Sequence, residues 1–356
     1  MSSADEVLIL GASGRTGRAI AARLDAAGVP LALYGRDATR LETAAQALTQ
    51  NPRLVTGSLT DLRARLNENH PAVVLNTVGP FADTAARVID ALPEGTHYLD
   101  LSNEYPAFQA VFDRHNAAVA AHRTLVPGAG FGVVATDSVL LALLEGKPTP
   151  THVRVDAAPS VALEAAPLGD ALAASIVGGL PLGRRQVRDG LLISKPFDDN
   201  SATVKTPDGE LLTSANFTSG DLFTAARSSQ APNVVSASTE VPSGAMARYA
   251  LPPFFVLSRS PRVRGFLTKR LARVEPKARP RPRPHSWARA AATWPDGDTG
   301  EAWLRVQADA MDFTAAAAAE VAKRLQRGEG KPGVHTPCEL FGSGLAEAAG
   351  GELLLN

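Results

Sequence analysis

The feature that most constrains the fold of this chain is a short apolar segment that runs directly into three evenly spaced glycines. Val7–Leu10 leads into Gly11, Gly14 and Gly17, whose spacing is G-x-x-G-x-x-G, and a helical pattern follows at once. A strand, a tight glycine turn and a helix in this order are typical of a dinucleotide-binding turn. The alternative interpretation is a tight strand–helix turn that binds no ligand.

Each glycine has a distinct expected role in such a turn. Gly11 permits the sharp turn, Gly14 lets the backbone approach a pyrophosphate, and Gly17 lets the helix pack closely on the strand. The start of the helix offers unpaired N–H groups and the positive end of its dipole to the phosphates. The residues that we expect to bind the dinucleotide here therefore include, besides the glycines, Ser13, Arg15 and Thr16.

Short apolar segments alternate with helical patterns from Glu6 to about Leu144. Near-continuous apolar strands separated by helices predict a doubly wound α/β fold with a parallel sheet covered on both faces. The expected strands are Val7–Leu10, Leu31–Tyr34, Leu54–Thr56, Ala72–Asn76, His97–Leu101 and Thr124–Pro127. The expected helices are Gly14–Ala27, Asp37–Thr49, Leu59–Glu68, Ala82–Leu92 and Glu104–Ala121.

The end of the second strand favours one form of the dinucleotide over the other. Arg36 follows Gly17 by 19 residues, at the strand tip where an acidic residue would select the ribose hydroxyls of NAD. An arginine there offers a planar fork to the 2′-phosphate of NADP, and Arg15 adds a second positive charge. We therefore expect NADP(H), with NAD less favoured. The alternative is a solvated Arg36 beside an Asp37 that binds the ribose.

The ends of the fourth and fifth strands supply the other candidate site residues. Ligands of open parallel sheets bind at the carboxyl ends of the strands, near the change in strand order. We expect the cofactor to contact Ser102 and the segment after the fourth strand, which consists of Asn76, Thr77, Val78, Gly79 and Pro80. The candidate catalytic residues are Tyr98, Asp100, Glu104 and Arg227. Ser102 also suits the cap of the next helix.

After about Pro150 the regular alternation of apolar strands and helices ends, and short strand patterns separated by turns follow. This change predicts a second α+β domain with a mixed or antiparallel sheet. We expect a dinucleotide-binding domain at 1–132, completed by 310–356, and a second domain at 133–309. The glycine-rich segment Pro127–Gly132 is interpreted as a hinge or as backbone close to a ligand, with an apolar helix opening at Thr136 or Asp137. The expected strands are Thr151–Ala157, Gln186–Leu192, Ala202–Thr206, Glu210–Thr213 and Val234–Thr239, with helices at Ala171–Leu180, Phe223–Ser228 and Phe313–Leu325.

Composition narrows the classes of protein to consider. The 356 residues are 45% apolar and 20% charged, with a formal net charge of zero, so no global field favours nucleic acid or a membrane surface. A single cysteine, Cys338, excludes an intrachain disulfide framework and shows no metal-ligand spacing, so we expect no metal. No secretory signal or membrane span is evident, so we expect a cytoplasmic protein. An exposed sheet in the second domain makes a homodimer the expected assembly.

One stretch departs from this even charge balance. Between Arg259 and Arg289 there are eleven lysines and arginines against one acid, Glu275. Alternating prolines in Lys277–Pro284 deny that part a helix or central strand, so it is expected to be extended and exposed. The favoured interpretation is a solvated basic loop. Docking of an acidic carrier domain or a phosphorylated substrate is the second interpretation, and a nucleic-acid arm is disfavoured.

These motifs together resemble bacterial members of the saccharopine dehydrogenase-like family, which includes the trans-acting enoyl reductases. The motifs span nearly the whole chain: Gly11–Gly17, Tyr34–Arg36, Asn76–Phe81, His97–Leu101, Pro127–Phe131, Phe223–Ser228, Pro232–Val234 and Pro332–Pro337. The resemblance implies a Rossmann domain with an inserted mixed-sheet domain and the substrate between them. Near Gly130 the chain departs from the family, which often has cysteine and aspartate or serine where this chain has Ala129 and Gly132.

The resemblance also implies a reaction, in which a nicotinamide cofactor reduces an imine or an activated alkene. No tyrosine is followed four residues later by lysine, so the proton-donating pair of short-chain alcohol dehydrogenases has no candidate. The leading hypothesis is an NADPH-dependent reductase of a C=N or polarised C=C bond in a small-molecule or carrier-bound substrate. The rival hypothesis is a non-catalytic NADP sensor that binds a partner.

Overall fold

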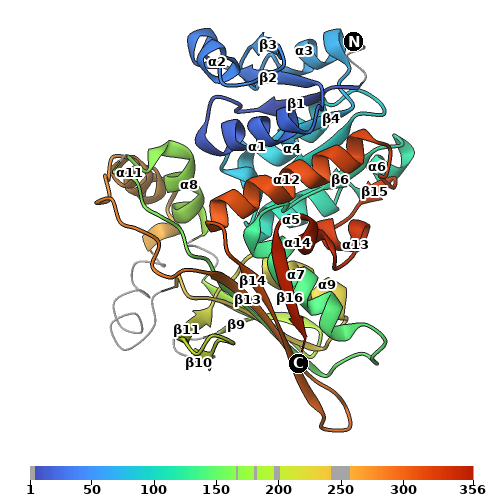
Figure 1. The fold of residues 1–356 in the computed structure, drawn as a ribbon, viewed down its shortest axis with the longest axis vertical. Coiled ribbons are helices and arrows are strands. Elements are labelled where there is room, and N and C mark those ends of the chain that lie inside the picture. Colours follow the sequence, from blue (N-terminus) through green and yellow to red (C-terminus); the bar gives the residue numbers. More distant parts are fainter. Residues whose placement is uncertain (1–4, 166, 180–182, 196–200, 242–256, 356) are drawn as a thin grey trace. The chain divides into compact units, whose positions relative to one another are not determined.

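A computed structural model describes residues 5–165, 167–179, 183–195, 201–241 and 257–355 of the chain, which divide into two compact units (Figure 1). The first unit comprises Met1–Ser102, Pro106–Gly130 and Met311–Phe341. The second comprises Asn103–Tyr105, Phe131–Ala310 and Gly342–Asn356. Both units are therefore discontinuous in the sequence.

The first unit contains a seven-stranded parallel sheet with the order β15-β6-β5-β4-β1-β2-β3. Its strands are β1 (Val7–Leu10), β2 (Leu31–Gly35), β3 (Arg53–Thr56), β4 (Val73–Asn76), β5 (His97–Asp100), β6 (Thr124–Val126) and β15 (Gly333–Val334). Strand β1 lies between β2 and β4, where the strand order reverses as in Rossmann-type sheets. The predicted fold class is confirmed. The seventh strand, β15, is not among the strands expected from the sequence.

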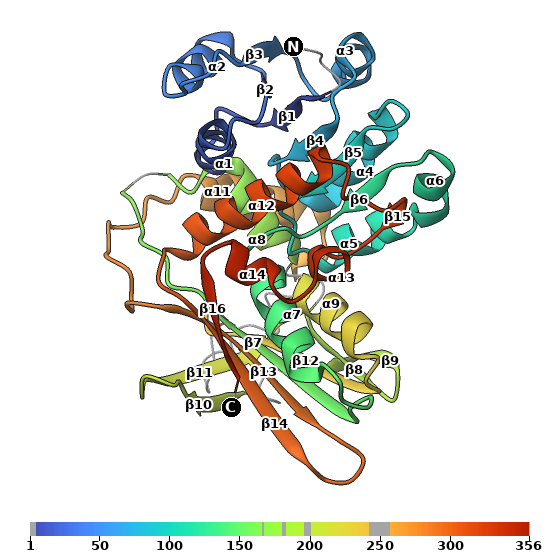
Figure 2. The same ribbon diagram turned by 45° about the vertical axis from the view of Figure 1, so that its right-hand side comes forward.

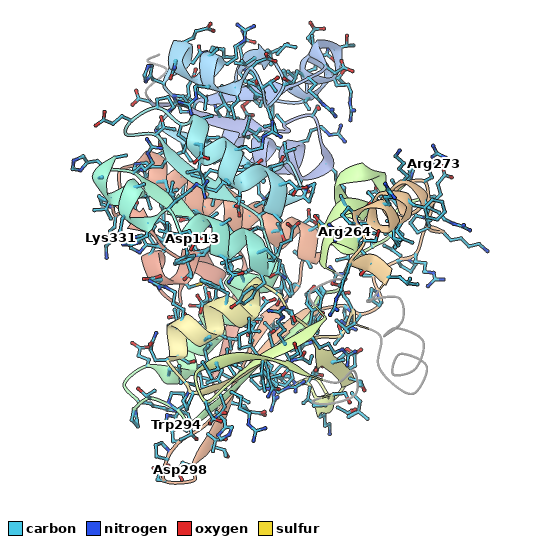
Figure 3. The ribbon with its side chains drawn as sticks, turned by 180° about the vertical axis from the view of Figure 1, so that it is seen from behind. Asp113, Arg264, Arg273, Trp294, Asp298 and Lys331 are labelled. Atoms are coloured by element: carbon cyan, nitrogen blue, oxygen red, sulfur yellow. The ribbon has the colours of Figure 1, made fainter. Side chains whose placement is uncertain are left out.

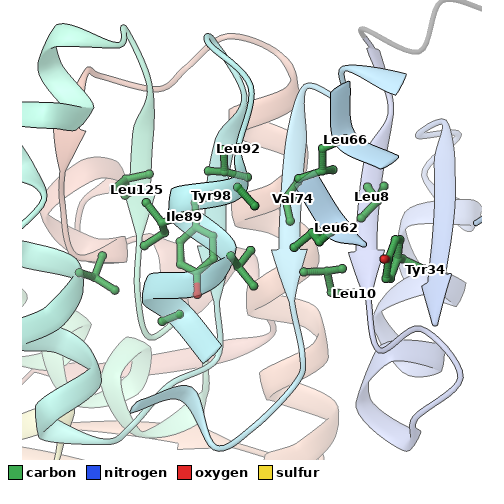
Figure 4. Close-up of a cluster of buried hydrophobic side chains, with 14 of the residues drawn as sticks. Leu8, Leu10, Tyr34, Leu62, Leu66, Val74, Ile89, Leu92, Tyr98 and Leu125 are labelled. Carbon is green, nitrogen blue, oxygen red and sulfur yellow. The ribbon is translucent and has the colours of Figure 1, made fainter. Parts of the chain in front are cut away.

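Alternate strand residues form an apolar layer on one face of this sheet. Leu8, Leu10, Val74 and Tyr98 pack there with residues of the covering helices, among which Figure 4 labels Leu62, Leu66, Ile89 and Leu92. The helices of this face are α3 (Leu62–Asn69), α4 (Phe81–Ala91), α5 (Tyr105–Phe112) and α6 (His115–Ala120). The last two replace the single helix predicted over Glu104–Ala121.

The opposite face of the sheet carries the other set of buried strand residues, including Val7, Ile9, Leu33 and Leu75. Figure 1 shows α1 (Arg15–Ala26) and α12 (Ala310–Gln326) on this side. Leu41 of α2 (Ala38–Ala45) is fully buried. Helices on both faces explain why the strands read as continuous apolar runs.

The second unit is built on a mixed sheet whose main path is β10-β11-β12-β7-β13-β14-β16, with β8 paired to β12 and β9 paired to β8 (Figure 2). Its longest strands are β7 (His152–Ala158), β13 (Ser286–Thr293) and β14 (Thr299–Val306). The remaining strands are β8 (Arg184–Arg188), β9 (Leu191–Lys195), β10 (Ala202–Lys205), β11 (Leu211–Asn216), β12 (Asn233–Ser238) and β16 (Gly351–Leu355). Among the described strands of this sheet, only β12 and β7 pair in parallel.

Helices of the second unit cover one face of this sheet. Helix α7 (Phe131–Leu144) packs on β13 and β14, and α9 (Gly220–Ser229) packs on β12 and β7. Helices α8 (Gly169–Gly179) and α11 (Pro261–Ala272) pack on each other. Two short helices follow in the chain, α13 (Pro337–Phe341) in the first unit and α14 (Leu345–Ala348) in the second.

Several expectations for the second half of the chain were wrong in detail. Helix α7 begins at Phe131, so Thr136 and Asp137 lie inside it instead of opening it. The strand predicted at Gln186–Leu192 is a hairpin, because Asp189 and Gly190 both have positive φ and form its turn. The predicted end of the helix at Leu180 falls outside the described residues.

The C-terminal region also differs from its expected place. From the sequence, all of 310–356 is expected to complete the first domain. Strand β16 instead pairs antiparallel with β14, which places the last residues in the second unit. Residues Met311–Phe341 do belong to the first unit.

Candidate functional site

The glycine turn after β1 requires glycine at two positions for two different reasons. Gly11 has φ +79°, and a Cβ there would lie 2.7 Å from the Thr77 hydroxyl oxygen. A Cβ on Gly17 would lie 2.5 Å from the carbonyl oxygen of Gly11 and 2.9 Å from the Cα of Ala12. Gly11 therefore allows the loops after β1 and β4 to meet, and Gly17 allows α1 to start against the turn.

The start of α1 is suited to bind an anion. Gly14 is its N-cap residue, is exposed and gives the helix no capping side chain, and the first turn holds no acidic residue. The N–H groups that a helix start leaves unpaired are thus not blocked by a carboxylate or hydroxyl of the cap. Arg15 is exposed here, while Ser13 and Thr16 are half-buried.

At the end of β2, two neighbouring charged residues have different environments. The Asp37 carboxylate accepts a hydrogen bond from the Arg40 backbone N–H at 3.1 Å and caps α2. Arg36 is exposed, and its side chain makes no hydrogen bond or ion pair with any residue that the structure describes. The capping role of Asp37 disfavours the alternative in which Asp37 binds a ribose.

The loop after β4 is held against β1 by its own polar groups. The Thr77 hydroxyl donates to the carbonyl oxygen of Leu10 at 2.6 Å, and the backbone N–H of Val78 donates to the Asn76 side chain at 2.9 Å. The Gly79–Pro80 peptide bond is cis. Thr77, Val78, Gly79 and Pro80 are all half-buried, so this loop presents partly accessible backbone beside the glycine turn.

A buried hydrogen-bond network joins the carboxyl ends of β4, β5 and β6. The Asn76 amide donates to the Tyr98 hydroxyl at 3.3 Å, and that hydroxyl donates to Asp100 at 2.8 Å. The other Asp100 oxygen accepts from the Ser102 hydroxyl at 2.7 Å and from the backbone N–H of Gly128 at 2.9 Å. Asn76, Tyr98 and Asp100 are fully buried, and Ser102 is 1% exposed.

This burial changes the interpretation of three residues proposed from the sequence. Desolvation by burial raises the pKa of Asp100, although the hydrogen bonds from Ser102, Gly128 and Tyr98 oppose that rise. Burial also raises the pKa of Tyr98 well above its ordinary value, and the nearby Asp100 adds to the rise. The structure thus does not place Tyr98 or Asp100 where a substrate can contact them. It also leaves Asn76 no exposed surface for a cofactor.

The other two candidate catalytic residues belong to the second unit. Glu104 is half-buried and accepts a hydrogen bond from the Ser175 hydroxyl of α8 at 2.6 Å. Arg227 is exposed in the last turn of α9. Sequence reasoning missed Asp221, in the first turn of α9, which is 4% exposed and accepts hydrogen bonds from Asn103 at 3.1 Å and from Ser219 at 2.7 Å. Asn103 and Asp221 crowd Gly132, where a Cβ would lie 2.8 Å from the Asn103 amide nitrogen.

A groove of about 1010 Å³ crosses the second sheet and includes none of these candidates. Arg154 and Arg289 line it, but both are paired with the buried Asp156. Among the residues that the structure describes, no cluster of His, Cys, Asp and Glu has the arrangement of a metal site. Within the same residues, no helix combines the length and the apolar character that crossing a membrane requires.

Comparisons with known proteins give limited matches. No family model and no curated protein matches the chain. A short-chain dehydrogenase/reductase from Vibrio parahaemolyticus is 14% identical, with 34% of this chain matching 82% of that one at a TM-score of 0.31. A short-chain dehydrogenase from Streptomyces avermitilis is 16% identical, and 34% of this chain matches 64% of that one, at a TM-score of 0.29.

A third similar structure is FolM Alternative dihydrofolate reductase 1 from Brucella suis in complex with NADP, which is 16% identical. There 36% of this chain matches 73% of that chain, with a TM-score of 0.30. At these scores, the Rossmann-type assignment of the first unit rests on its own strand order. The resemblance to the saccharopine dehydrogenase-like family is not supported by these comparisons.

Proposed function

We propose that this chain is an NADPH-dependent reductase of a C=N or polarised C=C bond. The observation that carries the proposal is the uncapped start of α1, which follows Gly11 at the point where the order of the parallel strands reverses. Dinucleotides bind such sheets at this position, with the pyrophosphate at the helix start. The donor set fits the group, because the first turn of α1 holds no acidic residue, and Arg15 and Arg36 are exposed cations.

In this proposal, different segments of the first unit bind different parts of NADPH. The turn from Gly11 to Gly17 holds the pyrophosphate, and Arg36 pairs with the 2′-phosphate. The half-buried loop Thr77–Pro80 contacts the nicotinamide ribose. Asn76, Tyr98, Asp100 and Ser102 act as positioning residues, because their network fixes the ends of three strands. The bound cofactor supplies the hydride.

In the same proposal, residues of the second unit recognise the substrate. Glu104 is the candidate acid, because its carboxylate is half-buried and accepts a hydrogen bond from Ser175. Arg227 is the candidate partner of a substrate carboxylate, through the bidentate contact that a guanidinium makes. The reaction class is tested by following NADPH oxidation with imines, enoyl thioesters, and α-keto acids mixed with amines. Turnover on either of the first two classes supports a reductase of that bond.

Replacing Arg36 tests the cofactor assignment directly. Arg36→Ala is expected to weaken NADPH binding by about 10–100-fold, because a charge-assisted contact contributes roughly 1.5–3 kcal/mol. NADH lacks the phosphate, so its affinity is expected to change little. Arg87→Ala removes another exposed arginine, in α4, and serves as the control. Calorimetric titration with both cofactors measures the effect, and equal losses for NADPH and NADH would contradict the assignment.

The burial of Tyr98 and Asp100 favours a second candidate function, a non-catalytic NADP-binding protein. Neither residue has an exposed oxygen for a substrate. Such a protein keeps the turn from Gly11 to Gly17 and Arg36 but transmits cofactor binding to a partner. Tight NADPH binding without turnover on the substrate panel, together with cofactor-dependent capture of a partner, would favour this alternative.

A further inference from the structure

Helix α11 presents a cationic face that the proposed reductase function does not use. Arg262, Phe266, Arg270 and Arg273 follow one another at intervals of three or four residues, Lys269 lies three residues after Phe266, and all five are exposed. Residues with this spacing share one side of a helix. Figure 3 labels Arg273 at the end of this helix. The face thus consists of four cations around one aromatic side chain.

The opposite side of α11 is occupied by packing within the second unit. Val263, Leu267 and Leu271 are half-buried, Ala272 is 7% exposed, and α11 packs on α8. The helix is therefore anchored by its own apolar side. Its cationic side is exposed, and Phe266 on that side is 63% exposed.

Within the described part of the chain, the four cations of this face lack partners that would neutralise them. None of Arg262, Lys269, Arg270 and Arg273 makes a side-chain hydrogen bond or ion pair with another residue that the structure describes. Glu275 is the only acid between Arg259 and Arg289. Lys277 and Arg279, in the extended segment that follows, are also exposed and extend the positive charge. In a chain of zero net charge, this is a concentrated local positive field.

Exposed apolar side chains accompany this charge. Leu257, just before α11, is 60% exposed, and Val274, just after it, is 45% exposed. With Phe266 they place three large apolar groups along the cationic helix and its ends. Cations interleaved with exposed apolar groups are typical of helices that bind the surface of anionic bilayers.

We propose that the cationic face of α11 binds the surface of a bilayer that contains anionic lipids. Anionic lipid headgroups are mobile and can each move next to a cation of this face. A folded acidic partner, by contrast, would need carboxylates at fixed positions that match the positions of the cations. The apolar side chains gain nothing on a phosphate backbone. A single phenylalanine is also not the series of aromatic platforms that single-stranded nucleic acid requires.

Vesicle flotation of the purified full-length protein tests the proposal. Vesicles of phosphatidylcholine with phosphatidylglycerol are expected to carry the protein at low salt, and vesicles of phosphatidylcholine alone are not. The R262Q/K269Q/R270Q/R273Q variant is expected to lose at least 100-fold in partitioning, since each cation contributes about fivefold. Glutamine keeps a helix propensity close to that of arginine and lysine, so the fold is expected to survive.

Two controls separate this face from general effects of charge and hydrophobicity. The R87Q/K205Q/R327Q/K331Q variant removes four exposed cations elsewhere and is expected to bind vesicles nearly as the wild type does. Phe266→Ala is expected to weaken partitioning several-fold, whereas Leu211→Ala, at a 69% exposed leucine of β11, is expected to leave it unchanged. Unchanged thermal unfolding of each variant verifies its fold.

Three outcomes would overturn the proposal. The first is equal loss of vesicle binding in the two four-cation variants, which would indicate a non-specific charge effect. The second is binding to polyglutamate or duplex DNA at least as tight as to the anionic vesicles, with the same dependence on α11. The third is no flotation of the wild-type protein even at low salt.

Discussion

At the scale of single residues, the three glycines of the first turn separate into structural and ligand-binding positions. Gly17 is buried, and a Cβ there would overlap the backbone of Gly11 and Ala12. Gly14 is exposed at the helix start, where a Cβ would lie 3.2 Å from the Gly11 carbonyl oxygen. A methyl group is therefore expected to affect folding at Gly17 and ligand binding at Gly14.

The Gly17→Ala variant is expected to lose about 2 kcal/mol of unfolding free energy, because backbone atoms must move to accept the methyl group. Gly14→Ala is expected to lose less stability but to weaken NADPH binding at least tenfold. Gly265→Ala, inside α11 with open space around the added methyl group, is expected to stabilise the protein by up to about 1 kcal/mol. Urea unfolding and NADPH titration measure both quantities. Equal stability losses at Gly14 and Gly17 would contradict the division.

Residue chemistry alone predicted where β4 and β5 end but not the environment of the side chains at their ends. Asn76, Tyr98 and Asp100 end their strands, as a candidate site requires. Their side chains nevertheless satisfy each other and the backbone of Gly128. Polar groups at strand ends can either bind a ligand or form a buried hydrogen-bond network with each other. Only the burial of each polar atom distinguishes these two roles. The sequence carries no signal for that burial.

At the scale of elements, a histidine joins β5 to β6. His97 Nδ1 accepts a hydrogen bond from the Thr124 backbone N–H at 2.9 Å. Burial lowers the pKa of His97, and the Arg123 charge lowers it further. The folded state therefore prefers the neutral ring that accepts this bond, while the unfolded chain titrates near the ordinary value of about 6.5.

Stability from His97 is thus fully present above about pH 6.5 and is lost as the pH falls toward the lower folded-state pKa. His97→Asn keeps a polar side chain but does not titrate. As the pH falls from about 7.5 to 5, the unfolding free energy of the wild type is expected to decrease more than that of His97→Asn. Urea unfolding across this range measures it. His152→Asn replaces an exposed histidine and serves as the control.

The elements that sequence reasoning recovered are those with strong local signals. The strands β1 to β6 are short apolar runs, and each is bounded by a helix or turn, so the parallel sheet was predictable. Strand β13 was missed because Ser286–Thr293 is alanine-rich, and alanine favours helix over strand. Ala288, Ala290 and Ala292 are buried where α7 packs on β13. Close packing between this helix and strand therefore explains the alanines, although alanine does not favour a strand locally. The Asp189–Gly190 turn did have a recognisable signal.

At the scale of the whole molecule, the chain connects its two units more than once. After Ala310 it enters the first unit, forms α12, β15 and α13, and returns at Gly342 to end in β16. Strand β16 pairs with β14 over Gly351–Leu355, and Leu354 packs against the cluster that contains Trp287 and Trp303. The last strand thus completes the second sheet, although the residues just before it belong to the first unit.

Removing residues 351–356 is therefore expected to affect the two units unequally. Loss of the β16–β14 hydrogen bonds and of Leu354 is expected to destabilise the second unit by roughly 3 kcal/mol. The NADPH affinity is expected to stay within about twofold, because the turn from Gly11 to Gly17 and Arg36 lie in the first unit. Glu352→Gln removes only the half-exposed ion pair with Arg305 and serves as the control, expected to cost under about 1 kcal/mol. Limited proteolysis assigns the destabilised segments, and NADPH titration measures the first unit. A parallel collapse of NADPH binding would mean that the dinucleotide site depends on the completed second sheet.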